Sequence, residues 1–241
     1  MTRGNLSSNY TYQQKFTRVG LRGLLATILM MIALFPFSIY MPFAGYFLSF
    51  SMSIFLLFSV YTVSQNKRTL WIGIFLAVPT FISSWSIGFS GFKSSLFIDM
   101  FTNILFIGFI TLVLMEAVFK AKRITGDIIA GSICIYLLLG FLWSFIYILC
   151  DLFLPNSFTM KPNSIESQYN YFYFSFVTLT SLGYGDISPN NPFSETFAML
   201  EAVVGQIYLT VMVAWLVGVH VSQQEVSANQ KSVDKNLEAD V

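Results

Sequence analysis

The sequence predicts an all-α integral membrane protein with six transmembrane helices and a re-entrant helix between the fifth and sixth. Three observations predict this fold. Hydrophobic residues make up 55% of the 241 residues and charged residues only 10%, whereas soluble domains carry about 25% charged residues. Several apolar segments reach the roughly 20 residues needed to cross a bilayer. One further apolar segment is too short to cross and is followed by glycines and prolines.

Composition and charge exclude several function classes. A soluble domain of this size could not bury so much apolar surface, which argues against a soluble enzyme. Thirteen basic and twelve acidic residues give a net charge of +1, so there is no electrostatic bias toward nucleic acid. Cys134 and Cys150 lie about 24 Å apart along one predicted helix, too far to bridge each other. With His220 as the single histidine, we expect no metal site and no cofactor.

The apolar segments follow one another with short polar interruptions. Leu24 to Gln65 carries no charge and is about twice the length of one span. Prolines and a glycine near its middle divide it into a predicted hairpin. Charged or polar loops separate the later segments. The six predicted spans are residues 23–41, 43–63, 70–88, 96–119, 128–153 and 195–221.

The distribution of Lys and Arg predicts the orientation of these spans. With both termini in the cytoplasm, eleven basic residues lie on the inner side and two, Lys93 and Lys161, on the outer side. Cytoplasmic loops of membrane proteins carry such an excess of basic residues. We therefore expect a multi-pass protein of the cell (plasma) membrane with both termini in the cytoplasm and membrane lipid as its surroundings.

The short apolar segment, residues 170–182, lies between the fifth and sixth spans. About a dozen helical residues reach only about 18 Å, so this helix can enter a membrane but not cross it. Gly183 and Gly185 break the helix, and Pro189 and Pro192 follow. Non-helical backbone at membrane depth is tolerated only where it is buried in protein or lines a wet cavity. Residues 181–185 are therefore expected to face a polar pathway.

The residues Thr180-Ser-Leu-Gly-Tyr-Gly-Asp186 resemble the selectivity filter of the potassium channel family. The sequence of that filter is usually written T-T/S-V/I/L-G-Y-G-D. The resemblance extends over residues 128–221, which would comprise outer helix, pore helix, filter and inner helix. It implies a potassium-selective channel that is a homotetramer, with K⁺ as the permeant ion. The chain then divides into a cytoplasmic segment (1–22), four spans (23–123), a pore domain (124–221) and a cytoplasmic tail (222–241).

The resemblance also assigns roles to individual residues. Carbonyl oxygens would bind K⁺ in the established manner of this family, and glycine would take the positive-φ positions at little cost. Asp186 would lie at the outer mouth, where Tyr173 is the bracing aromatic residue able to donate a hydrogen bond. Gly205 matches the hinge glycine of the inner helix. The ion-binding carbonyls would belong to Ser181, Leu182, Gly183 and Tyr184, within a filter that also includes Thr180 and Gly185.

Helical periodicity in the sixth span extends this assignment. Residues spaced by four from Gly205 fall on one stripe. The stripe is expected to line the cavity below the filter. Its members are Leu209, Val213 and Val217.

Two other functions compete with the channel. Gly183-Tyr-Gly-Asp186 also fits the GxGD motif of intramembrane aspartyl proteases, which need a second aspartate to share a proton. The candidates for that aspartate are Asp99 and Asp151. The second alternative is a non-conducting membrane sensor or scaffold. We favour the channel, which is not an enzyme, because surface turn residues rather than a helix follow Asp186.

Charged residues inside the spans indicate how the pore is controlled. The fourth span, 96–119, has no Arg or Lys, so the charges that make voltage sensors steep are missing there. Asp99 and Glu116 lie near span ends, and we expect solvation at the interface. Glu201 lies deeper, and two roles stay open for it: a hydrogen bond behind the filter, or titration. His220 is expected to be an inert residue at the inner mouth.

Overall fold

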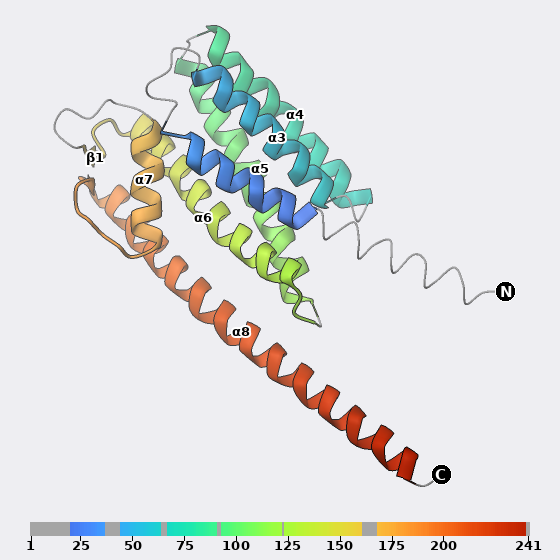
Figure 1. Cartoon of the computed structure of the whole chain (residues 1–241). Coiled ribbons are helices and arrows are strands. Elements are labelled where there is room, and N and C mark those ends of the chain that lie inside the picture. The colour runs from blue at the N-terminus through green and yellow to red at the C-terminus, as the bar shows by residue number, and fades with distance from the viewer. Residues whose placement is uncertain are drawn as a thin grey trace.

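The computed structural model describes residues 20–36, 44–63, 67–90, 93–121, 123–160 and 168–239. Almost all of this chain is helical (Figure 1). The helices are Gly20–Leu34, α3 (Ala44–Val63), α4 (Lys67–Ser90), α5 (Lys93–Phe119), α6 (Gly126–Phe153), α7 (Gln168–Leu179) and α8 (Pro192–Ala239). Two short antiparallel strands, β1 (Phe158–Thr159) and β2 (Ser188–Pro189), complete the described elements.

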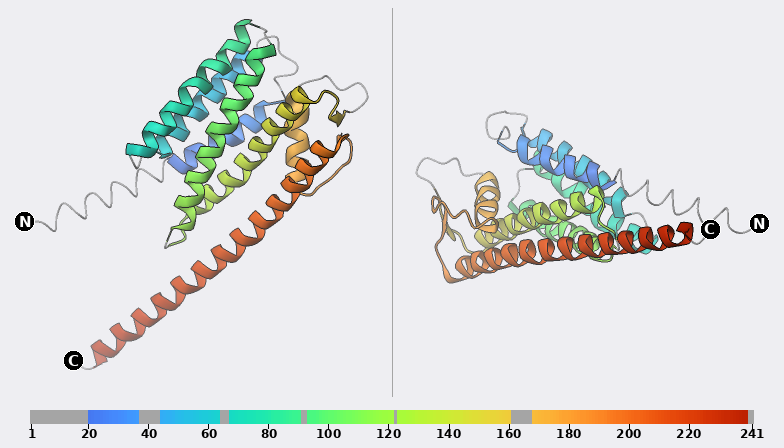
Figure 2. Two further views of the ribbon diagram at one scale, coloured as in Figure 1. Left: turned by 180° about the vertical axis from the view of Figure 1, so that it is seen from behind. Right: turned by 60° about the horizontal axis from the view of Figure 1, so that its bottom comes forward.

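The long helices pack side by side, and the short α7 lies at one end of them (Figures 1 and 2). Helices α3, α4 and α5 form one layer, and α5 packs against α6. Helix α7 contacts both α6 and α8, while the second half of α8 extends beyond the other helices. The core between α5, α6 and the first helix is built from large aliphatic and aromatic side chains, among them Leu24, Phe106, Ile110 and Leu138.

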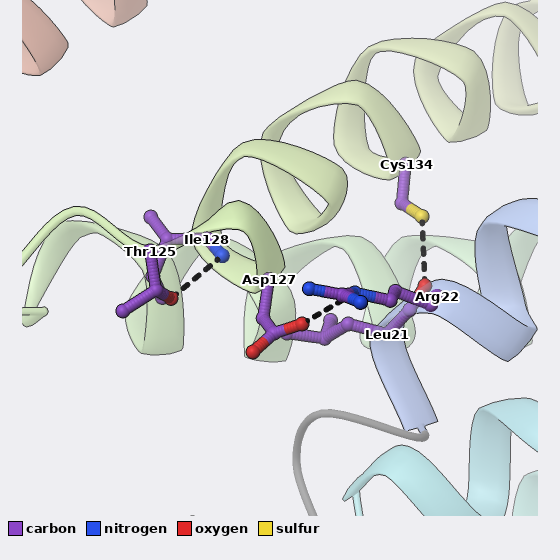
Figure 3. A network of polar contacts seen from close by, with 6 residues as sticks. All are labelled: Leu21, Arg22, Thr125, Asp127, Ile128 and Cys134. Carbon is purple, nitrogen blue, oxygen red and sulfur yellow. Dashed lines mark hydrogen bonds and ion pairs between the residues drawn. The ribbon is translucent and has the colours of Figure 1, made fainter.

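The first helix is fixed to the start of α6 by polar contacts (Figure 3). The guanidinium of Arg22 pairs with the carboxylate of Asp127, 2.7 Å apart. Thr125 caps α6, because its side chain accepts a hydrogen bond from the backbone of Ile128. Asp127 lies in the first turn of α6, where the helix dipole favours an acidic residue. The opposite end of the first helix reaches α7, since the ring of Phe35 packs against Phe172.

Three of the described helices are long and apolar enough to cross a membrane: Leu96–Phe119, Gly126–Phe153 and Pro192–Gln224. An all-helical membrane protein is therefore supported, while the number of six spans stays a prediction. The first helix ends at Leu34, short of the predicted residue 41. Pro36 explains this end, because proline disfavours the helical conformation of the residue before it and lacks an N–H. Residues 37–43 lie outside the described residues.

The structure describes the two terminal segments only in part. The predicted polar tail, 222–241, continues α8 as a helix to Ala239, and residues 240–241 lie outside the described residues. Most of the predicted N-terminal segment, residues 1–19, also lies outside them. Both cysteines are free and buried on α6, in agreement with the prediction that they do not bridge each other.

The expectation for Asp99 is wrong, and the one for Glu116 agrees with the structure. Asp99 is only 5% exposed and accepts hydrogen bonds from Ser83 and Ser84 of α4 at 2.8 and 3.0 Å. A neighbouring helix, rather than solvent, therefore surrounds this carboxyl group. Glu116 is exposed and pairs with Lys120 one turn later.

Candidate functional site

The segment after α7 has an unusual backbone. Positive φ values occur at Ser181 (56°), Gly183 (57°) and Gly185 (73°), whereas Leu182 and Tyr184 between them are not in this region. The handedness of the backbone therefore alternates from residue to residue. The sequence analysis expects glycines to take the positive-φ positions, and Gly183 and Gly185 occupy two of the three. Ser181 is the unexpected third, since a left-handed conformation costs an ordinary residue roughly 1–2 kcal/mol.

The N–H groups of this segment turn back to the end of α7. Leu182 and Gly183 both donate to the carbonyl of Val177, at 2.9 and 3.3 Å, and Ser181 donates to Thr178 at 2.9 Å. None of the described residues donates a hydrogen bond to the carbonyls of residues 181–184. These residues are exposed in the single chain. We call the carbonyl oxygens of residues 181–184 the backbone row. Each carbonyl can accept two hydrogen bonds, so these oxygens have lone pairs that no described residue uses.

The C-terminal end of the row is held by an aromatic residue and an acid. The hydroxyl of Tyr173 donates to the Asp186 carboxylate at 2.7 Å, and the N–H of Ile187 donates to its other oxygen at 3.1 Å. The chain then pairs with the segment after α6 through β1 and β2. Asp186 is thus fixed where the backbone row ends.

The N-terminal end of the row and the end of α7 are held by two residues that the sequence analysis did not single out. The side-chain amide of Gln206 on α8 donates to the hydroxyl oxygen of Ser181 at 2.9 Å. The hydroxyl of Tyr136 on α6 donates to the carbonyl of Leu179 at 3.1 Å. Gln206 lies next to Gly205 and Tyr136 lies inside an apolar span, and neither belongs to a sequence motif. Only the folded chain brings these two residues to this segment.

Gly205 lies where α8 comes closest to the end of α7. A Cβ atom built on this glycine would lie 2.4 Å from the Leu179 carbonyl oxygen and 3.0 Å from its side chain. Such a distance is far shorter than real contacts, so only glycine fits here without a shift of backbone. The hinge stays a prediction, and α8 is helical through this residue. Close packing is a second and sufficient reason for the glycine.

A buried acid also links α8 to α7. Glu201, one turn before Gly205, has no exposed surface. Its carboxyl group makes short hydrogen bonds with the hydroxyls of Tyr147 on α6 and Ser175 on α7. These contacts agree with the hydrogen-bonding role left open for this residue, and titration stays a prediction.

The predicted cavity stripe lies on an open face of α8. Leu209, Val213 and Val217 are 38%, 58% and 57% exposed in the single chain, whereas Tyr208 and Met212 are 7% and 4% exposed. The hydroxyl of Tyr208 donates to the Ser132 carbonyl of α6 at 2.7 Å. The two rows of residues on α8 therefore have different neighbours, and the stripe lies on a face that α6 leaves free.

Comparison with known families identifies this region. Residues 132–220 match the family model described as ion channel. This segment is therefore similar to an ion channel, and we refer to it below as the ion-channel domain. It extends from α6 through α7 and the backbone row into α8, and the helices before α6 lie outside the match. Comparison of the chain with curated proteins and with solved structures gives no match.

The match favours a channel over the competing protease. In the ion-channel domain, Asp151 accepts hydrogen bonds from the Tyr171 hydroxyl and the Ser157 backbone at 2.7 and 2.8 Å. Asp186 is held by Tyr173, and Asp99 by serines of α4. In these contacts each candidate carboxyl group accepts hydrogen bonds from hydroxyl or backbone N–H groups. The two acids of an aspartyl dyad would instead share a proton with each other. No cluster of metal-binding side chains occurs among the described residues.

Proposed function

We propose that the chain is one subunit of a potassium-selective channel in the plasma membrane, which conducts K⁺ passively through a filter formed by residues 180–186. The observation that carries this proposal is the row of carbonyls at residues 181–184, to which none of the described residues donates a hydrogen bond. Oxygens of this kind can replace the water molecules around a dehydrated K⁺ ion. K⁺ is then the permeant ion, and no resident cofactor or nucleic acid is required.

The proposed assembly is a homotetramer. One chain contributes one wall of oxygens, and an ion needs oxygens on all sides, so four chains around one axis would complete the ring. The exposed side chains of Leu182 and Tyr184, at 56% and 66% in the single chain, would pack against neighbouring protein. The open stripe of α8 would line the cavity below the filter, and Asp186 would attract cations at the outer mouth.

The remaining parts of the proposal concern topology and gating. Both termini are proposed to be cytoplasmic, because the basic residues lie mainly on that side. Lipid would contact the outward faces of α3 and α4, where Leu57, Trp71 and Phe75 are exposed. Steep voltage gating is not part of the proposal, since residues 96–119 of α5 carry no basic side chain.

Flux of K⁺ and Na⁺ through purified protein in lipid vesicles tests the function. We expect the wild type to pass K⁺ and reject Na⁺. Gly183→Ala places a Cβ at a residue with φ 57°, which costs roughly 1–2 kcal/mol in each chain of the ring. This variant should remain tetrameric on gel filtration but lose K⁺ flux or K⁺-over-Na⁺ selectivity.

The matched control is Leu57→Ile on α3, because Leu57 is 72% exposed and far from α7 in sequence. It should keep both flux and selectivity. Full selectivity in Gly183→Ala would mean that residues 180–186 are not the filter. Cleavage of a membrane peptide without any ion flux would instead support the protease.

A further inference from the structure

A buried polar cluster joins the three helices of the ion-channel domain. It consists of Tyr147 on α6, Ser175 on α7 and Glu201 on α8, and we call it the Glu201 cluster. None of the three side chains has exposed surface.

The hydrogen atoms of the Glu201 cluster can be counted from its contacts. Ser175 Oγ lies 2.7 Å from the Gly140 carbonyl oxygen and 2.5 Å from Glu201 Oε1. A hydroxyl has one hydrogen and a carbonyl has none, so Ser175 must donate to Gly140. The short contact with Glu201 then requires a hydrogen on the carboxyl group. Tyr147 donates its own hydrogen to Glu201 Oε2, so each of the three contacts contains a hydrogen only when the acid is protonated.

The ionised alternative leaves two contacts unexplained. If Glu201 were a carboxylate, Ser175 would donate to it and would face the Gly140 carbonyl at 2.7 Å without a hydrogen between the two oxygens. Ser144 cannot place a hydrogen between Ser175 and Gly140, because its own hydroxyl already donates to the Gly140 carbonyl at 2.6 Å. Two oxygens in contact through lone pairs alone repel each other, so the geometry disfavours the carboxylate.

The surroundings of Glu201 also favour a neutral acid. The rings of Phe158 and Phe174 pack on the ring of Tyr147, with distances between ring centroids of 5.3 and 5.0 Å. Among the described residues, the titratable groups that face Glu201 are Tyr147 and Tyr136 of α6, and Cys150 faces Tyr147; α7 contributes the Ser175 hydroxyl. No ion pair with Glu201 occurs in the part of the chain that the structure describes. A buried carboxylate without a cation is strongly disfavoured.

We propose that Glu201 is a protonated acid whose O–H donates to Ser175, and that this hydrogen bond positions α7 and the filter backbone. The role as a positioning residue rests on the proposed channel function. The path from the acid to the filter is short. Ser175 lies two residues before Val177, whose carbonyl holds the N–H groups of Leu182 and Gly183. Loss of the acid hydrogen would leave the single hydrogen of Ser175 for two contacts, so α7 could keep its hydrogen bond to α8 or its hydrogen bond to α6, but not both.

Infrared difference spectra of the full chain in lipid vesicles test the protonation state directly. Subtracting the Glu201→Gln spectrum from the wild-type spectrum at neutral pH should leave the C=O band of a protonated carboxylic acid. Ser175→Ala should shift that band without removing it, because a hydrogen-bond partner is lost. Glu195→Gln, at the exposed start of α8, is the matched control and should remove carboxylate bands only. Carboxylate bands in the Glu201→Gln difference would overturn the proposal.

Flux measurements test the positioning role. Glu201→Gln should keep K⁺ flux and selectivity, since its amide N–H can donate to Ser175 and its oxygen can accept from Tyr147. Glu201→Ala should lose selectivity. Wild-type flux should fall as alkaline pH removes the acid hydrogen, and Glu201→Gln should not show this fall. Loss of selectivity in Glu201→Gln, or the same alkaline fall in both proteins, would overturn the positioning role. A wild type without K⁺ flux but with the acid band would refute the channel function and leave the protonation state intact.

Discussion

Gly205→Ala gives a quantitative test of the contact between α8 and the end of α7. The added Cβ would lie 2.4 Å from the Leu179 carbonyl oxygen. This carbonyl cannot move aside freely, because it accepts a hydrogen bond from Tyr136 at 3.1 Å. One of the two helices must therefore shift, and the shift is transmitted to the backbone that begins at Thr180.

Two opposing effects decide the sign of the change in stability. Replacing glycine by alanine inside a helix stabilises the protein by roughly 0.5–1 kcal/mol. Overpacking of a filled site costs typically 1–3 kcal/mol, and a clash with backbone belongs in the upper part of that range. The net effect should be a destabilisation of about 1–2 kcal/mol per chain. A glycine needed only for bending would give the opposite sign.

Thermal unfolding in detergent, combined with K⁺ flux in vesicles, measures both consequences. Gly205→Ala should unfold at a lower temperature than the wild type and should conduct less. Gly218→Ala is the matched control on the same helix, because no atom lies within 4 Å of its added Cβ in the single chain. It should unfold at the same or a slightly higher temperature. If Gly205→Ala is as stable as Gly218→Ala and conducts normally, the close packing inferred here is wrong.

Three further predictions concern the mouth, the cavity and gating. Tyr173→Phe removes the 2.7 Å hydrogen bond to Asp186 and should cost about 1.5–3 kcal/mol, as for bonds to charged groups; a double-mutant cycle with Asp186→Asn should show this coupling, and additive effects would contradict it. Val213→Cys should react with water-soluble thiol reagents from the cytoplasmic side of the open channel, whereas Met212→Cys, at a buried position, should react slowly; the reverse order would reverse the faces of α8. Open probability should change little over 100 mV, because the span within α5 lacks basic residues; steep sigmoidal activation would refute this.

The sequence alone predicted a membrane protein and the position of its candidate site. Apolar segments of spanning length and the distribution of basic residues predict a membrane protein, because the bilayer sets both requirements. The pattern at Thr180–Asp186 predicted an ion-conducting segment, since backbone carbonyls and glycines carry its chemistry. The family match at residues 132–220 agrees with that location.

The tertiary structure decided which side chains hold this segment in place. Tyr136, Gln206 and the partners of Glu201 lie far from the filter motif in sequence or carry no motif of their own, and contacts between helices bring them to it. The same holds for Asp99, which helix packing buries although its position near a span end suggested solvation. Periodicity reports which face of a helix is apolar, but not which neighbour covers it. The short distance between Gly205 of α8 and the Leu179 carbonyl follows only from that packing. This distance explains why the position requires glycine.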